Sequence, residues 1–241
     1  MTQLGQIFNE PEVARQLNAD IRNDFAVAEA ALADSGHSAL KAVWLDCMPD
    51  LEGNGGCCNE GRPGWDPSKT IFVGGGHGGP NIIMEESGLI NAFADRPDSW
   101  YCVSIEDIIQ ADPDVFVIVD ASWDSAVGKL DYLHNHSDYC KLRAVQEAEY
   151  IKIQFSASTL GPRNGVAALD MVSAAMHLHT GDAVLNFQSG VDFFEDEFLK
   201  DHTASLKCPY VGKSEKVQYK ETRPRPQPQS LPQPEPEPEP E

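Results

Sequence analysis

The sequence has few basic residues: 18 Lys and Arg stand against 38 Asp and Glu, which gives a formal net charge of −20. Nucleic-acid binding requires clustered Lys and Arg to neutralise phosphates. No such cluster occurs here, so nucleic acid is not an expected partner, and neither is an anionic membrane surface. An acidic surface instead favours a cationic ligand or a basic docking partner.

Long apolar runs are also missing, since no stretch approaches the roughly 18 residues that a membrane-spanning helix needs. The first residues, MTQLGQIFNEPEV, contain neither the basic nor the apolar region of a secretory signal peptide. We therefore expect a chain that is not membrane-spanning and that shows no signal peptide within its 241 residues.

Paired C-x-x-C motifs, the usual mark of a structural zinc site, are absent as well. The six cysteines, at positions 47, 57, 58, 102, 140 and 208, are an even number and therefore compatible with disulfides. Buried free thiols and metal ligation are the alternatives. The sequence leaves these three states open, and with them the cellular compartment.

A long helix is predicted near the start of the chain. Apolar residues recur at spacings of three and four over positions 10–34, beginning at Val13 and Leu17, and Gly36 is a suitable C-terminal stop. At about 1.5 Å per residue, such a helix is roughly 37 Å long. This is long for a globular helix, so we expect it to span more than one layer.

Short apolar runs alternate with helical patterns over the next part of the chain, and the clearest run is PDVFVIVD at 113–120. Strands that alternate with helices favour a mostly parallel sheet covered on both faces. The predicted fold class is therefore α/β, with a three-layer, mostly parallel sheet flanked by helices. The other predicted strands are 41–47, 70–73, 100–104 and 150–155.

From about residue 207 this pattern ends, and the sequence becomes RPRPQPQSLPQPEPEPEPE, with proline at nearly every second position. Such a segment cannot bury a core and is expected to be extended and solvated. The predicted organisation is a long helix over 1–36, an α/β lobe over 37–206 and a disordered Pro- and Glu-rich tail over 207–241.

The segment FVGGGHGGPNIIMEESG, residues 72–88, contains a G-x-G-x-x-G pattern at 74–79, between an apolar run and a predicted helix. A dinucleotide loop also needs an acid at the end of the next strand to hold the ribose, and that strand ends at Ser104. A nucleotide-binding α/β enzyme is therefore an alternative with an incomplete fingerprint. The other interpretation is a strand-to-helix corner that exposes His77 at the carboxyl end of a parallel strand.

Four segments resemble motifs of one protein family, in the same order along the chain. They are LGQIFNEPEVARQL, GGGHGGPNIIMEESGLINAFAD, VSIEDIIQADPDVFVIVD and LRAVQEAEYIKI. They resemble, respectively, the start of a long helix, a stretch ending in N-v-f-a-d, a V-S-x-E run followed by P-D and a strand, and an A-V motif before a strand. The family is the iron–siderophore and vitamin B12 class (class III) of periplasmic substrate-binding proteins of ABC importers.

In that family one long helix joins two α/β lobes, and the ligand is held in the cleft between them. The resemblance therefore identifies 1–36 as the inter-lobe helix and 37–206 as the C-terminal lobe, with the N-terminal lobe absent from this sequence. It implies a solute-binding component of an importer, periplasmic or extracellular, and not an enzyme. No nucleophile–base pair or paired-carboxylate motif suggests catalytic residues.

The implied ligand is a metal chelate such as an iron–siderophore, cobalamin or haem. Iron or cobalt would then belong to the ligand, so neither a cofactor nor a protein-bound metal is expected. The implied partner is an ABC permease or the missing N-terminal lobe. Because one lobe cannot bury most of a small ligand, a scaffold lobe that binds no ligand is a further alternative.

Candidate ligand-binding residues are those expected on loops after the carboxyl ends of the strands. Trp123 suits stacking on a planar ligand and Arg163 suits pairing with an anionic oxygen, although a packing tryptophan and a surface arginine are the simpler alternatives. By resemblance, Glu106 is expected to dock on the permease; a solvated acid at a helix start is the alternative. The candidate ligand-binding set is Asp46, Trp65, His77, Trp123 and Arg163.

Overall fold

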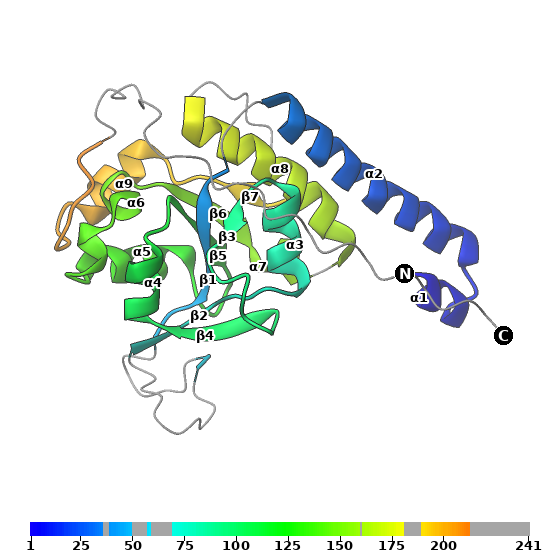
Figure 1. Cartoon of the computed structure of the whole chain (residues 1–241), viewed down its shortest axis with the longest axis horizontal. Coiled ribbons are helices and arrows are strands. Elements are labelled where there is room, and N and C mark those ends of the chain that lie inside the picture. The colour runs from blue at the N-terminus through cyan, green and yellow to red at the C-terminus, as the bar shows by residue number, and fades with distance from the viewer. Residues whose placement is uncertain (36–38, 50–56, 59–68, 160, 181–188, 213–241) are drawn as a thin grey trace.

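The computed structural model describes residues 1–35, 39–49, 57–58, 69–159, 161–180 and 189–212 of the chain. Within these residues one sheet has the strand order β4-β2-β1-β5-β6-β7, and β3 pairs with the beginning of β1 (Figure 1). The strands are β1 (Lys41–Cys47), β2 (Thr70–Gly74), β3 (Ile90–Asn91), β4 (Trp100–Ser104), β5 (Val115–Asp120), β6 (Tyr150–Gln154) and β7 (Val191–Asp192).

The centre of the sheet is parallel: β1 pairs with β5, and β5 with β6, all in the same direction. These strands are the nearly unbroken apolar runs of the sequence, because a parallel strand is buried on both faces. The predicted α/β class is confirmed. The predicted strand at 70–73 also forms, as β2, but it runs antiparallel to β1. The pairings β2–β4 and β6–β7 are antiparallel as well.

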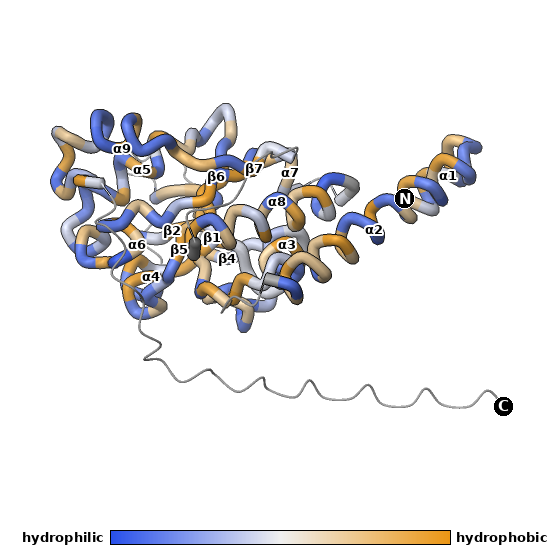
Figure 2. The backbone as a smooth tube through the Cα atoms, turned by 90° about the horizontal axis from the view of Figure 1, so that it is seen from above, coloured by the Kyte–Doolittle hydropathy of each residue, from blue (hydrophilic) through white to orange (hydrophobic). Residues whose placement is uncertain are grey.

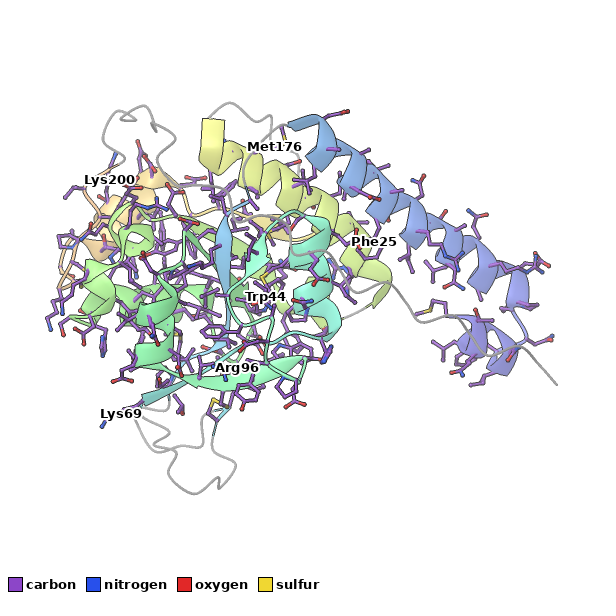
Figure 3. All side chains as sticks on the ribbon, viewed as in Figure 1. Phe25, Trp44, Lys69, Arg96, Met176 and Lys200 are labelled. Atoms are coloured by element: carbon purple, nitrogen blue, oxygen red, sulfur yellow. A yellow bond between two sulfur atoms is a disulfide. The ribbon has the colours of Figure 1, made fainter. Side chains whose placement is uncertain are left out.

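Helices cover both faces of the sheet, giving the expected three layers (Figure 1). One face buries residues of α4 (Ile105–Ala111), α5 (Ala126–Asn135), α6 (Arg143–Gln146) and α9 (Asp196–Thr203), together with the short 3-10 helix η2 (Tyr139–Lys141). The other face buries residues of α3 (Gly78–Glu86), α7 (Phe155–Thr159) and α8 (Gly161–Thr180). Trp44, at the middle of β1, is fully buried on this second face (Figure 3).

The long helix predicted from the spacing over 10–34 is α2 (Pro11–Ser35), which packs along α8 as a further layer (Figure 1). It does not span the whole of 1–36, because residues 2–7 form a separate short helix. Phe25 on α2 and Met176 on α8 belong to the apolar cluster between the two helices (Figure 3). At the beginning of α8, Gly165 lies so close to α2 that an added Cβ would meet Ile21 and Asp24. No helix among the described residues has both the length and the apolar character needed to cross a membrane.

The first part of α2 extends past the beginning of α8 (Figure 2), and we call this part the overhang. Gly165, in the second turn of α8, lies beside Ile21 and Asp24 of α2. The short helix α1 (Thr2–Ile7) folds back onto α2. Large apolar side chains are exposed here: Ile7 at 72%, Phe8 at 71% and Val13 at 61%. The overhang therefore leaves part of its predicted apolar stripe uncovered.

The six cysteines, whose state the sequence left open, form three disulfides. The three bonds are Cys47–Cys57, Cys58–Cys102 and Cys140–Cys208, and none of the six cysteines is free. The first two bonds tie the adjacent residues 57 and 58 to the end of β1 and to β4. The third fixes the end of the described chain to η2.

The C-terminal boundary of the lobe lies further along the chain than the predicted residue 206. Cys208 is disulfide-bonded, its carbonyl oxygen lies 2.5 Å from Nδ1 of the buried His134, and Tyr210 is only 3% exposed. The Tyr210 amide donates to Thr203 Oγ1 at 2.8 Å. Residues 207–212 are therefore part of the folded lobe, and only the tail prediction for 213–241 lies outside the described residues.

Candidate functional site

The carboxyl ends of β1, β5 and β6 lie side by side, and we call them and the segments that follow the carboxyl edge. Leu45 pairs with Ile118, and Asp120 pairs with Gln154. Asp46 is therefore level with the last residues of β5, and Phe155 follows the same edge on β6. In open α/β sheets this edge is where ligands bind.

Trp123 stands on the carboxyl edge with 69% of its surface exposed. Its ring meets that of Phe155 edge to face, with 4.9 Å between the centroids. The loop that carries it is closed by paired backbone hydrogen bonds between Ala121 and Asp124, both 3.2 Å. The indole is thus packed against Phe155 on one side while most of its surface is exposed to solvent, which suits stacking on a flat ligand.

Lys129 holds the same loop from inside the protein. Its side chain is fully buried, and Nζ donates to the carbonyl oxygens of Val119 and Asp124, both at 2.8 Å. Nζ also lies 2.9 Å from Asp124 Oδ2. The two carbonyl contacts are hydrogen bonds, and the contact with Asp124 Oδ2 is an ion pair without hydrogen-bond geometry. They tie the end of β5 to the beginning of α5.

Asp46 is a half-buried carboxyl group beside this cluster. Burial raises its pKa from 3.8 to about 6; the nearby Lys129 charge opposes the rise and the Asp124 charge adds to it. The residue therefore changes its charge near neutral pH, which is unusual for an aspartate. A titrating group at a ligand-binding edge is a candidate functional residue.

Arg163, on the first turn of α8, is half-buried and already hydrogen-bonded. Its Nη1 donates to Ser156 Oγ at 2.5 Å, and its Nη2 donates to the Ser189 carbonyl oxygen at 2.8 Å. Ser189 in turn donates to the buried Asp170. The guanidinium thus joins α7, α8 and the segment before β7. A contact with ligand stays a prediction.

In the glycine corner at 74–79, the backbone packs directly against the backbone of residues 94–99. The amides of Gly75 and Gly76 donate to the carbonyl oxygens of Ser99 and Arg96, both at 2.9 Å. A Cβ on Gly76 would collide with the carbonyl oxygen of Ala94. The amides of Gly75 and Gly76 are therefore not available to a pyrophosphate, and close packing explains these two glycines.

The orientation of β2 also corrects the prediction for His77. Because β2 is antiparallel to β1, His77 does not follow the carboxyl end of a parallel strand. The first turn of α3 nevertheless reaches α7, since a Cβ on Gly79 would collide with the Ser158 carbonyl oxygen. His77 itself is exposed and forms the N-cap of α3 without a side-chain cap hydrogen bond.

Two other candidates do not join this group. Glu106 is exposed in the first turn of α4, beside a complete capping box between Ser104 and Asp107. Trp65 lies outside the described residues. Among the residues that are described, no three His, Cys, Asp or Glu side chains are grouped to hold a metal ion.

The structure adds residues that the sequence did not suggest: Asp124, Lys129 and Phe155. The run DASWDS after the strongest strand contains Asp124, so a loop carboxylate could have been noticed there. The sequence contains no indication that Lys129 is buried, because a lysine in a helix is usually exposed. It is buried because its Nζ reaches the end of β5 and the loop that contains Asp124.

Neither a protein-family model nor a curated protein sequence matches the chain. Solved structures do match. A periplasmic heme-binding protein, RhuT from Roseiflexus sp. RS-1, aligns with a TM-score of 0.55 and 20% identity, covering 70% of this chain and 58% of that one. A periplasmic heme-binding protein from Pseudomonas aeruginosa aligns with a TM-score of 0.59 and 16% identity, covering 80% and 62%.

A protein of an ABC-type Fe³⁺-hydroxamate transport system from Saccharomonospora viridis aligns at a TM-score of 0.53 and 22% identity, covering 75% of this chain and 53% of that one. This chain thus spans less than two thirds of the length of the structures that it matches. These neighbours are binding proteins rather than enzymes. The chain has the fold of class III periplasmic substrate-binding proteins, the siderophore and vitamin B12 class, with the partial coverage expected of a single lobe.

Proposed function

We propose that this chain is the C-terminal lobe of a substrate-binding protein that captures a metal chelate for an ABC-type importer. The role is binding and delivery, without catalysis. The observation that carries the proposal is Trp123, which is 69% exposed yet fixed against Phe155 at the carboxyl edge of the central parallel strands. An indole that is exposed to water and held in one orientation at a ligand-binding edge is typical of a recognition surface.

The overhang of α1 and α2 supports a two-lobed protein. α8 begins just after α7, which follows the carboxyl end of β6. Because α2 extends past the beginning of α8, its first residues lie beyond the end of α8 that follows β6 (Figure 1). We infer that a second α/β lobe covers the exposed Ile7, Phe8 and Val13 and faces Trp123 across the ligand.

The disulfides support a location outside the cytoplasm. All six cysteines are paired, and structural disulfides persist in oxidising compartments such as the periplasm and the cell exterior. The matched neighbours RhuT and the Pseudomonas aeruginosa protein are also periplasmic proteins.

Glu106 is the proposed contact with the permease. It is exposed, and α4 presents it on the outer surface beside β4. A single exposed ion pair contributes less than about 1 kcal/mol. Docking through Glu106 would therefore depend on a matching contact from the second lobe and on electrostatic steering by the acidic chain.

Ligand titrations of the full chain test the proposal. A ferric hydroxamate, haem, cobalamin and NAD are each added, and binding is followed by tryptophan quenching and by equilibrium dialysis. We expect one of the chelates to bind and NAD not to bind. Trp123→Ala should weaken binding at least about tenfold, the effect of losing roughly 1.4 kcal/mol of stacking.

Phe198→Ala is the matched control, because Phe198 is also an exposed aromatic residue but lies on α9, away from the carboxyl edge. It should leave binding unchanged. A response to NAD alone would support the nucleotide-binding alternative. No response to any compound would support a scaffold lobe and would overturn the proposal.

A further inference from the structure

We propose that the ligand of the carboxyl edge is a flat metal chelate without net negative charge, held between the face of Trp123 and the carboxylate of Asp46. This inference rests on the proposed function and narrows its ligand class. It favours neutral or cationic macrocycles over chelates with free carboxylates or sulfonates.

The two basic residues that follow β5 and β6 are occupied within the protein. Lys129 is fully buried, and its Nζ contacts two carbonyl oxygens and Asp124 Oδ2 at 2.8–2.9 Å. Arg163 donates to Ser156 Oγ and to the Ser189 carbonyl oxygen. Neither cation is free to neutralise an anionic ligand without breaking these contacts.

A third basic residue, Lys69, precedes β2 and points away from the body of the molecule (Figure 3). It is exposed, so its charge is screened by water and salt. Lys69 therefore adds little to the potential at Trp123. Among the described residues, Lys69, Lys129 and Arg163 thus offer no built anion site at this end of the sheet.

Carboxylates outnumber these inner cations. Asp46, Asp120 and Asp124 lie at or beside the ends of β1 and β5, against Lys129 and Arg163. Asp120 accepts a hydrogen bond from the Ala126 amide at the start of α5, and Asp124 is paired with Lys129. Of these three carboxylates, Asp46 is the one that takes part in neither of these two contacts.

An anionic ligand at this edge would meet Asp46, and neither Lys129 nor Arg163, the described cations that follow β5 and β6, would be available as a countercharge. The chain as a whole also has a net charge of −20. A cationic ligand would gain from Asp46 and also from the face of Trp123, since an indole face attracts cations. Charge and ring geometry thus favour the same ligand class. A flat ring also matches the single indole plane that Phe155 fixes.

Two iron porphyrins of similar size provide the test. One carries peripheral N-methylpyridinium groups and is cationic, and the other carries sulfonatophenyl groups and is anionic. Each is titrated into the full chain at moderate salt, and binding is measured by the shift of the porphyrin absorption band. We expect the cationic porphyrin to bind at least about tenfold more tightly, the factor given by a single charge contact.

Variants separate a built site from general attraction to an acidic protein. Trp123→Ala should weaken binding of both porphyrins, and Asp46→Asn should reduce the preference for the cation. Asp201→Asn, which removes an exposed acid on α9, should change neither. The preference should also grow between pH 5 and 7.5, because Asp46, which faces Lys129 and Asp124, ionises in that range.

The outcomes distinguish this inference from the proposed function. Equal binding of the two porphyrins, or tighter binding of the anionic one, would overturn the charge inference and leave a chelate-binding function standing. A cation preference that Asp46→Asn and Asp201→Asn reduce equally would also overturn it, since the effect would then be general. Binding of neither porphyrin, together with silence toward the other chelates, would overturn both.

Discussion

Replacing Asp46 with asparagine should stabilise the folded protein at neutral pH. Burial raises the pKa of Asp46 in the folded state from 3.8 to about 6. Below pH 3.8 the carboxyl group is protonated in both states and has no effect. As the pH rises from 3.8 to 6, the unfolded chain releases the proton while the folded chain retains it. Stability due to this residue therefore falls across that window and is constant above it.

The magnitude follows from the two pKa values. The difference between 3.8 and about 6, at about 1.4 kcal/mol for each pH unit, amounts to about 3 kcal/mol. This is an upper value, because water reaches the half-buried side chain and screens its charge. Asparagine is nearly isosteric and cannot ionise, so Asp46→Asn should recover up to about 3 kcal/mol at pH 7.5 and almost nothing at pH 3.5.

Urea denaturation of both proteins at a series of pH values, without reductant, measures this difference. Other titrating groups affect both proteins equally and cancel. Among them is His134, whose pKa is lowered by burial and which therefore destabilises the fold as the pH drops below about 6.5. Asp201→Asn on α9 is the exposed control. An equal gain at pH 3.5 and 7.5, or a loss at pH 7.5, would refute the reasoning.

Three further predictions concern stability. Lys129→Met should cost about 3 kcal/mol in urea denaturation, because it leaves the half-buried Asp124 carboxylate without a countercharge and two carbonyl oxygens without their donor; an unchanged midpoint would contradict the assigned contacts. Replacing Cys140 and Cys208 by serine should cost about 2–4 kcal/mol in thermal melting, and no change would mean that the bond is dispensable. Gly76→Ala should lower stability by about 1–3 kcal/mol, since its Cβ meets a backbone carbonyl. Gly161→Ala, with open space at the Cβ, should not.

Periodicity was sufficient to predict the helices and strands that have a strong local pattern. The apolar run at 113–120 became β5, and the spacing over 10–34 became α2. Ser104 and Asp107, which have the S-x-x-D spacing of a capping box, form one in the structure. In each case the information lies within one segment, so tertiary contacts did not need to be known.

Features that depend on long-range pairing could not be predicted. The apolar run of β2 is compatible with either direction, and only its pairing with β1 makes it antiparallel. The cysteine count allowed disulfides but not their connectivity. The sequence pattern alone places residues 207–212 in the tail, because their attachment depends on Cys140 and His134 far earlier in the chain.

The candidate site was predictable only by residue type. Trp123 follows the strongest strand, and a large aromatic residue after a buried parallel strand is a reasonable binding candidate. Its exposure and its contact with Phe155 come from the neighbouring strand β6. Lys129 could not be identified, because the sequence contains no sign that α5 buries an ammonium group beneath the loop.

The carboxyl edge is also where the chain departs from the arrangement that stability alone would favour. Elsewhere apolar side chains fill both faces of the sheet. Here an indole is exposed, a carboxyl group is desolvated and an ammonium group is fully buried. Each costs folding free energy, and their occurrence together is unlike scattered surface variation. A binding surface accounts for all three, because the buried ammonium fixes the loop while the indole and the carboxylate stay available to a ligand.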